Sequence, residues 1–117
     1  HEGDVVLVRT GWSKLYRASP EKYIHEFAGI TTDAARWLAQ KKIVLLGMDN
    51  LALSVPDIFE VHMILIPDNG IYVVKNLVLE EMAKDKAYIC TVVILPLKIE
   101  GATGSLVRPI ALSPLPT

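Results

Sequence analysis

Residues 31–48, TTDAARWLAQKKIVLLGM, decide the fold class. Thr31 and Thr32 offer hydroxyl groups that can cap a helix, and two lysines end the pattern where cations suit the helix dipole. We therefore predict a helix over Thr32–Lys42, with one face made of Ala34, Trp37, Leu38 and Lys41. The apolar run Ile43–Met48 follows at once and predicts a buried strand. A helix that leads directly into such a strand indicates an α/β fold.

Outward from this stretch, the chain alternates between further apolar runs and turn signals. The run Ala87–Ile99 is the longest and nearly all apolar, so we expect it to be the central strand. Gly11–Ala28 is mixed and predicts a long loop or short helical turns of the kind that often line sites. No repeat or second domain is evident in 1–117. Shorter elements are predicted as strands at Asp4–Thr10, Ile71–Val74 and Val107–Leu112, as helices at Asp57–Ile66 and Leu79–Asp85, and as turns at Pro67–Gly70 and Gly101–Ser105.

The composition argues against nucleic-acid and membrane partners and leaves open why the chain is so apolar. With 12 basic and 13 acidic residues the net charge is −1, and no basic stripe indicates a nucleic-acid partner. The apolar run that ends at Leu97 is too short to span a bilayer, so no membrane partner is expected. A mean hydropathy of +0.35 is high for a domain of this size. It indicates either apolar surface covered by another chain or a well-filled core.

Histidines and carboxylates are the first candidates for chemistry. His62 lies in Glu60-Val61-His62, just after a loop that carries Asp57, and a histidine near carboxylates can ligate a metal. The alternative is an ordinary half-buried histidine. His25 has no partner at ligand spacing and is expected at the surface, and His1 is the first residue. The sequence holds no cluster that completes a metal site on its own.

Three other positions are weighed for function. Asp49 ends a buried strand, where α/β proteins often place functional groups, but it could equally cap the loop that follows. Cys90 is the single cysteine, and its place in an apolar run predicts a buried structural thiol. The turn Gly101–Ser105 lacks the lysine and the helix of a phosphate loop, and no nucleophile elbow is present.

Several motifs, in order, resemble the cyclase / kynurenine formamidase (arylformamidase-like) family of metal-dependent hydrolases. The resemblance runs from Gly3 to about Leu112, and the order of its pieces is more specific than any one of them. They are GDVVLVRTGW at 3–12, GI at 29–30 with DAARWL at 33–38, GMDN at 47–50, EVH at 60–62, GIYVVKNL at 70–77, PLKI at 96–99, GATGS at 101–105 and RP at 108–109.

The resemblance implies a swivelling β/β/α-type fold with a mixed sheet, flanking helices and an N-terminal part that is missing here. It also implies hydrolysis of an amide or lactam C–N bond, such as the formyl amide of N-formylkynurenine, with a divalent metal (zinc or manganese) in the parent protein. His62 matches a metal-ligand position of the family. Lys75 stands where the family has a glutamate ligand, and the family's H-x-G-T-H-x-D motif does not occur in these residues.

Two interpretations follow from this pattern. In the first, the chain is the C-terminal portion of a metal-dependent hydrolase, inactive and without bound metal on its own, and it packs against a missing N-terminal half or a second copy. In the second, it is a non-catalytic homologue that serves as a binding or assembly module. A single cysteine fits a reducing compartment, so we expect a cytoplasmic location; a signal upstream of His1 is compatible with the sequence.

Overall fold

A three-stranded parallel sheet forms the centre of the first of two compact units, His1–Glu81, in a computed structural model that describes residues 1–54 and 58–113. Its strands are β1 (Val5–Val8), β2 (Leu45–Met48) and β3 (Tyr72–Val74), in the order β1-β2-β3. The middle strand β2 pairs with both neighbours and is the most buried of the three. β1 is half-buried because it lies at an edge of this sheet.

The helix predicted from the deciding stretch is present as α3 (Thr32–Gln40), and Thr31 caps it as expected. The Thr31 hydroxyl accepts a hydrogen bond from the Ala34 backbone N–H at 3.2 Å. The buried face differs from the predicted one: Ala35 and Leu38 face the core, while Trp37 is 56% exposed. The capping residues therefore predicted where the helix begins, but the strand beneath it determined which side is buried.

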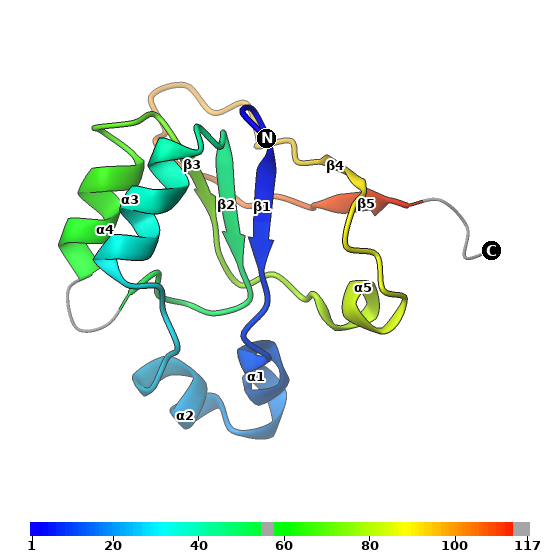
Figure 1. Cartoon of the computed structure of the whole chain (residues 1–117). Coiled ribbons are helices and arrows are strands. Elements are labelled where there is room, and N and C mark those ends of the chain that lie inside the picture. The colour runs from blue at the N-terminus through cyan, green and yellow to red at the C-terminus, as the bar shows by residue number, and fades with distance from the viewer. Residues whose placement is uncertain (55–57, 114–117) are drawn as a thin grey trace. The chain divides into compact units, whose positions relative to one another are not determined.

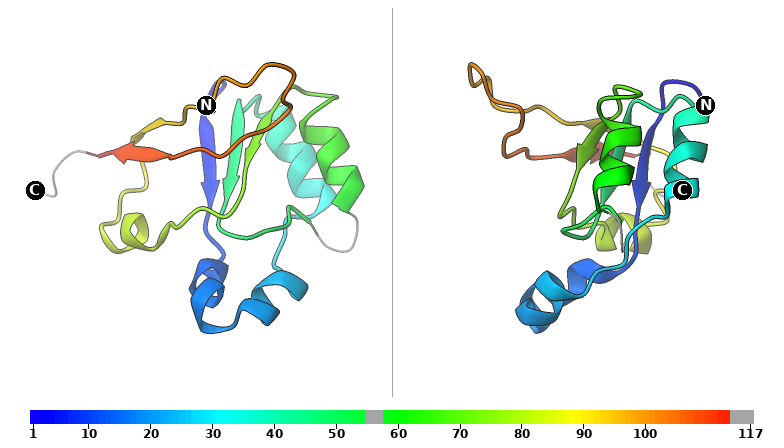
Figure 2. Two further views of the ribbon diagram at one scale, coloured as in Figure 1. Left: turned by 180° about the vertical axis from the view of Figure 1, so that it is seen from behind. Right: turned by 90° about the vertical axis from the view of Figure 1, so that its left-hand side faces the viewer.

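The core of this unit combines the sheet with α3 and a second helix, α4 (Ile58–Leu65), which packs against α3. Figure 1 shows the two helices beside the strands, and Figure 2 shows the same layers from two further sides. The fully buried side chains come from β2, from both helices and from the segments around them: Ala35, Leu46, Met48, Leu53, Val61 and Leu65. The α/β class is confirmed by this arrangement.

The expectation that Ala87–Ile99 forms the central strand is wrong. Only Thr91–Val93 of that run is a strand, β4, and it pairs antiparallel with β5 (Ile110–Leu112) in the second unit, 82–117. The resemblance implies a mixed sheet. The described strands instead form one parallel sheet and one antiparallel sheet. Pro96 has no N–H to offer a neighbouring strand, and an apolar run does not by itself state how many neighbours it will have.

Short helical turns connect β1 to α3, as the composition of that segment predicted. They are η1 (Trp12–Lys14), α1 (Leu15–Ala18) and α2 (Pro20–His25). Figures 1 and 2 place α1 and α2 beyond the carboxyl ends of the strands. The remaining helix is α5 (Glu80–Lys84). None of the helices in residues 1–54 and 58–113 is long and apolar enough to cross a membrane.

A Gly29→Ala variant is expected to lose about 3 kcal/mol of unfolding free energy. An added Cβ would lie 2.4 Å from the Ser54 Cα and 2.7 Å from the Leu53 carbonyl oxygen, so backbone would have to move. The Ile30 N–H also donates to the Leu53 oxygen, at 2.7 Å, across this close approach. Urea denaturation measures the loss. Gly104→Ala is the control, since no atom lies within 4 Å of its added Cβ. An equal loss of unfolding free energy in both variants would contradict the close approach of Gly29 to Ser54 as the cause.

Candidate functional site at the carboxyl edge of the parallel sheet

Polar side chains gather where β2 and β3 end. Asp49 and Asn50 follow β2 directly, and Lys75 and Asn76 follow β3. The backbone joins these two strand ends, because the Asn76 N–H donates to the Asn50 carbonyl at 3.0 Å. In open α/β sheets, ligands bind outside the carboxyl ends of the strands. This edge is therefore where a functional site is expected.

Asp49 is fully buried and holds the loop that leaves β1. Its Oδ1 accepts from the Thr10 N–H at 2.9 Å and from the Thr10 hydroxyl at 2.7 Å, and its Oδ2 accepts from the Gly11 N–H at 2.7 Å. The carboxylate thus caps the loop after β1, a neighbouring strand, rather than the loop that follows it in sequence. Gly11 has a φ of 81°, a left-handed conformation that suits glycine at this turn. Asp49 is a structural anchor at the edge of the site.

His62 and Lys75 come together although 13 residues separate them. The Lys75 Nζ lies 3.2 Å from the His62 Nε2, and since an ammonium only donates, the imidazole nitrogen accepts. Burial lowers the pKa of Lys75 below its ordinary value. His62, on α4, and Lys75, after the end of β3, are therefore brought together in space. At that point the chain places a cation beside the histidine.

The described residues do not fit a catalytic metal. Such a site needs about three protein ligands and an open position. Within 1–54 and 58–113, no group of three His, Cys, Asp or Glu side chains lies close enough to hold an ion. Lys75 would repel a cation at the His62 Nε2, and Asp49 already accepts three hydrogen bonds. Of these three side chains, His62 is the one that keeps the chemistry of a metal ligand.

Tyr23 and Asn76 form a second polar contact at this edge. The Tyr23 hydroxyl donates to the Asn76 Oδ1 at 2.7 Å, and Tyr23 is buried. Burial, followed by the Asp49 carboxylate, raises the pKa of Tyr23 above its ordinary value, so the phenol stays protonated and can donate. Asn76 has a φ of 59°, a left-handed conformation that asparagine tolerates better than most residues. This contact ties α2 to the segment after β3.

Two residues of this edge were missed in the sequence. Asn50 is fully buried, and neither its Nδ2 nor its Oδ1 has a hydrogen-bond partner among the described residues. Asn50 and Asn76 both lie in motifs of the resemblance, but neither is among the predicted site residues. The signal for both is the one that indicates Asp49, a polar residue directly after a strand. A buried amide without a hydrogen-bond partner among the described residues is unusual in a folded protein.

The other predicted site residues lie elsewhere or have structural partners. His25 is exposed, as expected, with its Nε2 3.4 Å from Glu21. Glu60 accepts from Arg36 at 2.8 Å and from Thr32 at 3.1 Å, which ties α4 to α3, while Asp57 lies outside the described residues. Cys90 is a free thiol, but it is half-buried before β4 rather than buried inside a long strand.

Comparisons with known proteins agree with this architecture. Residues 1–55 match the Cyclase family. A crystal structure of a novel cyclase is similar at 32% identity and a TM-score of 0.85, over 96% of this chain and 41% of that protein. The structure of a potential metal-dependent hydrolase with cyclase activity is similar at 27% identity and a TM-score of 0.72, over 99% of this chain and 54% of that one. No curated protein is significantly similar.

The similarity to cyclases covers nearly all of this chain but about half or less of either solved protein. The chain is thus similar to the Cyclase family in sequence over residues 1–55 and to solved cyclases in fold.

Proposed function

We propose that this chain forms the C-terminal portion of a metal-dependent hydrolase that cleaves amide or lactam C–N bonds. The observation that carries the proposal is the likeness to a solved cyclase over 96% of the chain, at 32% identity. The name of the second solved protein, a potential metal-dependent hydrolase, supports the reaction class. A formyl amide such as that of N-formylkynurenine is the substrate we propose for the whole protein, in a reducing compartment such as the cytoplasm.

His62 is the residue of this chain that we propose takes part in the site. It lies on α4 with its Nε2 directed at the end of β3, where Lys75 meets it at 3.2 Å. When bound in such proteins, a divalent ion activates water and polarises a carbonyl. The further ligands for zinc or manganese would have to come from residues outside those described here. We propose that the chain alone is therefore inactive.

A second candidate function is favoured by the Lys75–His62 contact. An ammonium 3.2 Å from the imidazole occupies the position a cation would need, so the chain could serve as a non-catalytic binding or assembly module of the same fold. Exposed apolar side chains in the second unit suit such a role, since Tyr88 and Ile89 are 80% and 90% exposed. A second copy of the chain is the partner proposed in this case.

Expression of the complete open reading frame that contains these residues separates the two functions. The hydrolase proposal predicts metal-dependent turnover of N-formylkynurenine with zinc or manganese, and a loss of at least about 100-fold in His62→Ala. His25→Ala is the matched control, because His25 is an exposed histidine beside Glu21, and it should keep full activity. No turnover with either metal, together with a stable dimer by sedimentation, would favour the assembly module.

A further inference from the structure

The second unit, 82–117, is built around the antiparallel pair of β4 and β5, which we call the ribbon. An isolated bridge between Pro96 and Val107 continues the register of this pair. Within 82–113 no side chain is buried, so the ribbon has no core of its own. A two-stranded sheet is marginally stable in water unless further strands or a helix pack on it. The ribbon is therefore expected to be covered by another element.

One face of the ribbon is apolar and exposed. Side chains alternate between the two faces along a strand, so the register of the pair assigns every second residue to the same face. The exposed members of this ribbon face are Leu95, Leu97, Leu106, Arg108, Ile110 and Leu112. Its leucines and its isoleucine are 49–85% exposed. Arg108 lies in the middle of them and pairs with no acid in residues 1–54 and 58–113.

The outer side of α4, in the first unit, carries a second exposed apolar surface. Phe59, Met63 and Ile66 recur at helical spacing and are 82%, 51% and 47% exposed, and we call them the α4 stripe. On its other side, the same helix buries Val61 and Leu65 fully in the core. A helix that is apolar on all sides is typical of one that is buried on all sides. The α4 stripe is therefore a surface that a partner is expected to cover.

The polar groups of α4 do not interrupt this stripe, and an acid stands at its end. Glu60 is hydrogen-bonded to α3 and His62 is in contact with Lys75, so both are directed at other parts of the first unit. Asp68 follows the stripe, and its N–H donates to the Met63 carbonyl oxygen at 3.1 Å. The Asp68 side chain is exposed and pairs with no cation in the part of the chain that the structure describes.

We infer that two copies of this chain associate by exchanging these surfaces. The ribbon face of each copy packs on the α4 stripe of the other, and Arg108 of each copy pairs with Asp68 of the other. The surfaces are complementary, since one is apolar with a cation and the other is apolar with an acid. The units as wholes are complementary too: residues 82–117 hold four basic and two acidic residues, whereas residues 1–81 hold 8 and 11. Because the exchange is reciprocal, it closes at two chains.

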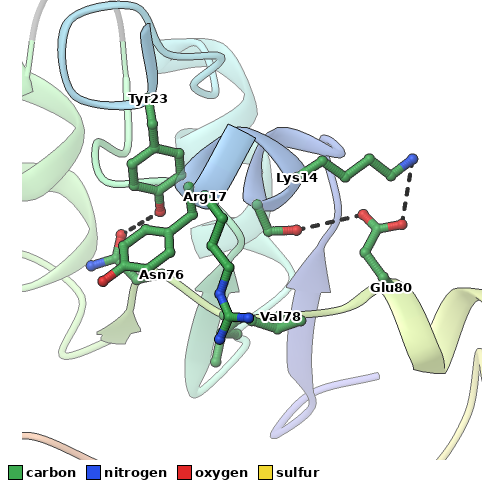
Figure 3. A pocket seen from close by; sticks show the side chains of 9 residues that line it. Lys14, Arg17, Tyr23, Asn76, Val78 and Glu80 are labelled. Atoms are coloured by element: carbon green, nitrogen blue, oxygen red, sulfur yellow. Dashed lines mark hydrogen bonds and ion pairs between the residues drawn. The ribbon is translucent and has the colours of Figure 1, made fainter. Parts of the chain in front are cut away.

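The inference specifies the surfaces of the assembly module proposed above, and it rests on that association of two copies rather than on hydrolysis or a metal. The pocket of about 540 Å³ between Arg17 and Val78, which Figure 3 shows, is lined by residues of neither surface. Substitutions in the ribbon face or in the α4 stripe therefore replace no residue of that pocket. Turnover by the complete protein is measured separately, so the failure of the hydrolase proposal and the failure of this inference are distinguishable.

Sedimentation equilibrium of the 117-residue chain tests the charge contact, and the unaltered chain should be dimeric at micromolar concentration. Arg108→Glu and Asp68→Lys should each raise the dissociation constant of the dimer at least about 10-fold, because like charges would then face each other. Both changes in one chain should return it to within about threefold of the unaltered value, since the ion pair forms again with its charges exchanged. Lys86→Glu is the matched control, because Lys86 is an exposed cation of the second unit outside the ribbon face. A monomeric unaltered chain, or a dimer that neither charge reversal weakens, would overturn the inference.

Mixing two variants tests the exchange itself. Phe59→Glu places a charge in the α4 stripe and Leu106→Lys places one in the ribbon face, so each protein alone should be monomeric where the unaltered chain is dimeric. An equimolar mixture should form a heterodimer, because one of its two contacts is intact and the other brings the new Glu and Lys together. Phe59 and Leu106 are 82% and 85% exposed, so both variants are expected to keep the circular dichroism spectrum of the folded chain. A mixture of folded variants that stays monomeric would show that the ribbon face and the α4 stripe do not meet.

Discussion

A Lys75→Glu variant is expected to bind zinc at least about 100-fold more tightly than the unaltered chain. A divalent ion and an ammonium ~4 Å apart repel by about 8 kcal/mol at an effective dielectric near 20. Lys75 is only half-buried and has a flexible stem, so it can swing partly into solvent, and solvent screens much of this repulsion. A remainder of about 3 kcal/mol corresponds to about 100-fold in affinity.

The measurement is calorimetric titration of zinc into both proteins, with elemental analysis of the purified chains. The unaltered chain should hold no stoichiometric zinc. Lys41→Glu gives the same change in net charge at the C-terminal end of α3, and it should bind zinc no better than the unaltered chain. Adding His62→Ala to Lys75→Glu should abolish the gain, because the imidazole 3.2 Å from the position of Lys75 is the other ligand. A gain that survives this second change would show that Lys75 does not control a site at His62.

An Asp49→Ala variant is expected to be less stable by about 3 kcal/mol or more. The carboxylate is fully buried and accepts from two N–H groups and one hydroxyl at 2.7–2.9 Å. A hydrogen bond to a charged group contributes about 1.5–3 kcal/mol, and donors left without a partner in a buried place add to the loss. These contributions are not independent, so the expected total is smaller than their sum.

Urea denaturation followed by circular dichroism measures this loss. Asp33→Ala is the control, because its side chain is 95% exposed in the first turn of α3, and it should change the unfolding free energy by less than about 1 kcal/mol. An Asp49→Ala variant as stable as the Asp33→Ala variant would contradict the anchoring role.

Local signals predicted much of the first unit correctly. The hydroxyl of Thr31 before a helical pattern marks where α3 begins, and Pro67–Gly70 forms the predicted turn before β3. These features depend on a few neighbouring residues, whose backbone preferences and hydrogen bonds act over three or four positions. The same locality explains why the buried face of α3 was misassigned: burial depends on what the helix packs against.

The order of the strands in the sheets could not be predicted from local sequence signals. The runs Ile43–Met48 and Ala87–Ile99 both predict apolar strands. The shorter run supplies β2, the middle strand of the parallel sheet, while the longer run supplies only β4, which pairs with β5 in a two-stranded sheet. An apolar run predicts that a strand will be buried. It does not predict which segments will bury it, because those segments are distant in the sequence. Loop closure and pairing between such segments are set by the whole chain.

For the candidate site, the sequence by itself determined which chemistry is available: one histidine at a matched ligand position, a lysine in place of a glutamate, and an aspartate after a buried strand. Only the tertiary structure decided how these groups are used. It placed the Lys75 Nζ 3.2 Å from the His62 Nε2, assigned Asp49 to the loop after β1, and formed the pocket between Arg17 and Val78. The physical reason is that hydrogen bonds and charge interactions act over a few ångströms in space, and folding brings into that range residues that lie 13 to 61 positions apart in the sequence.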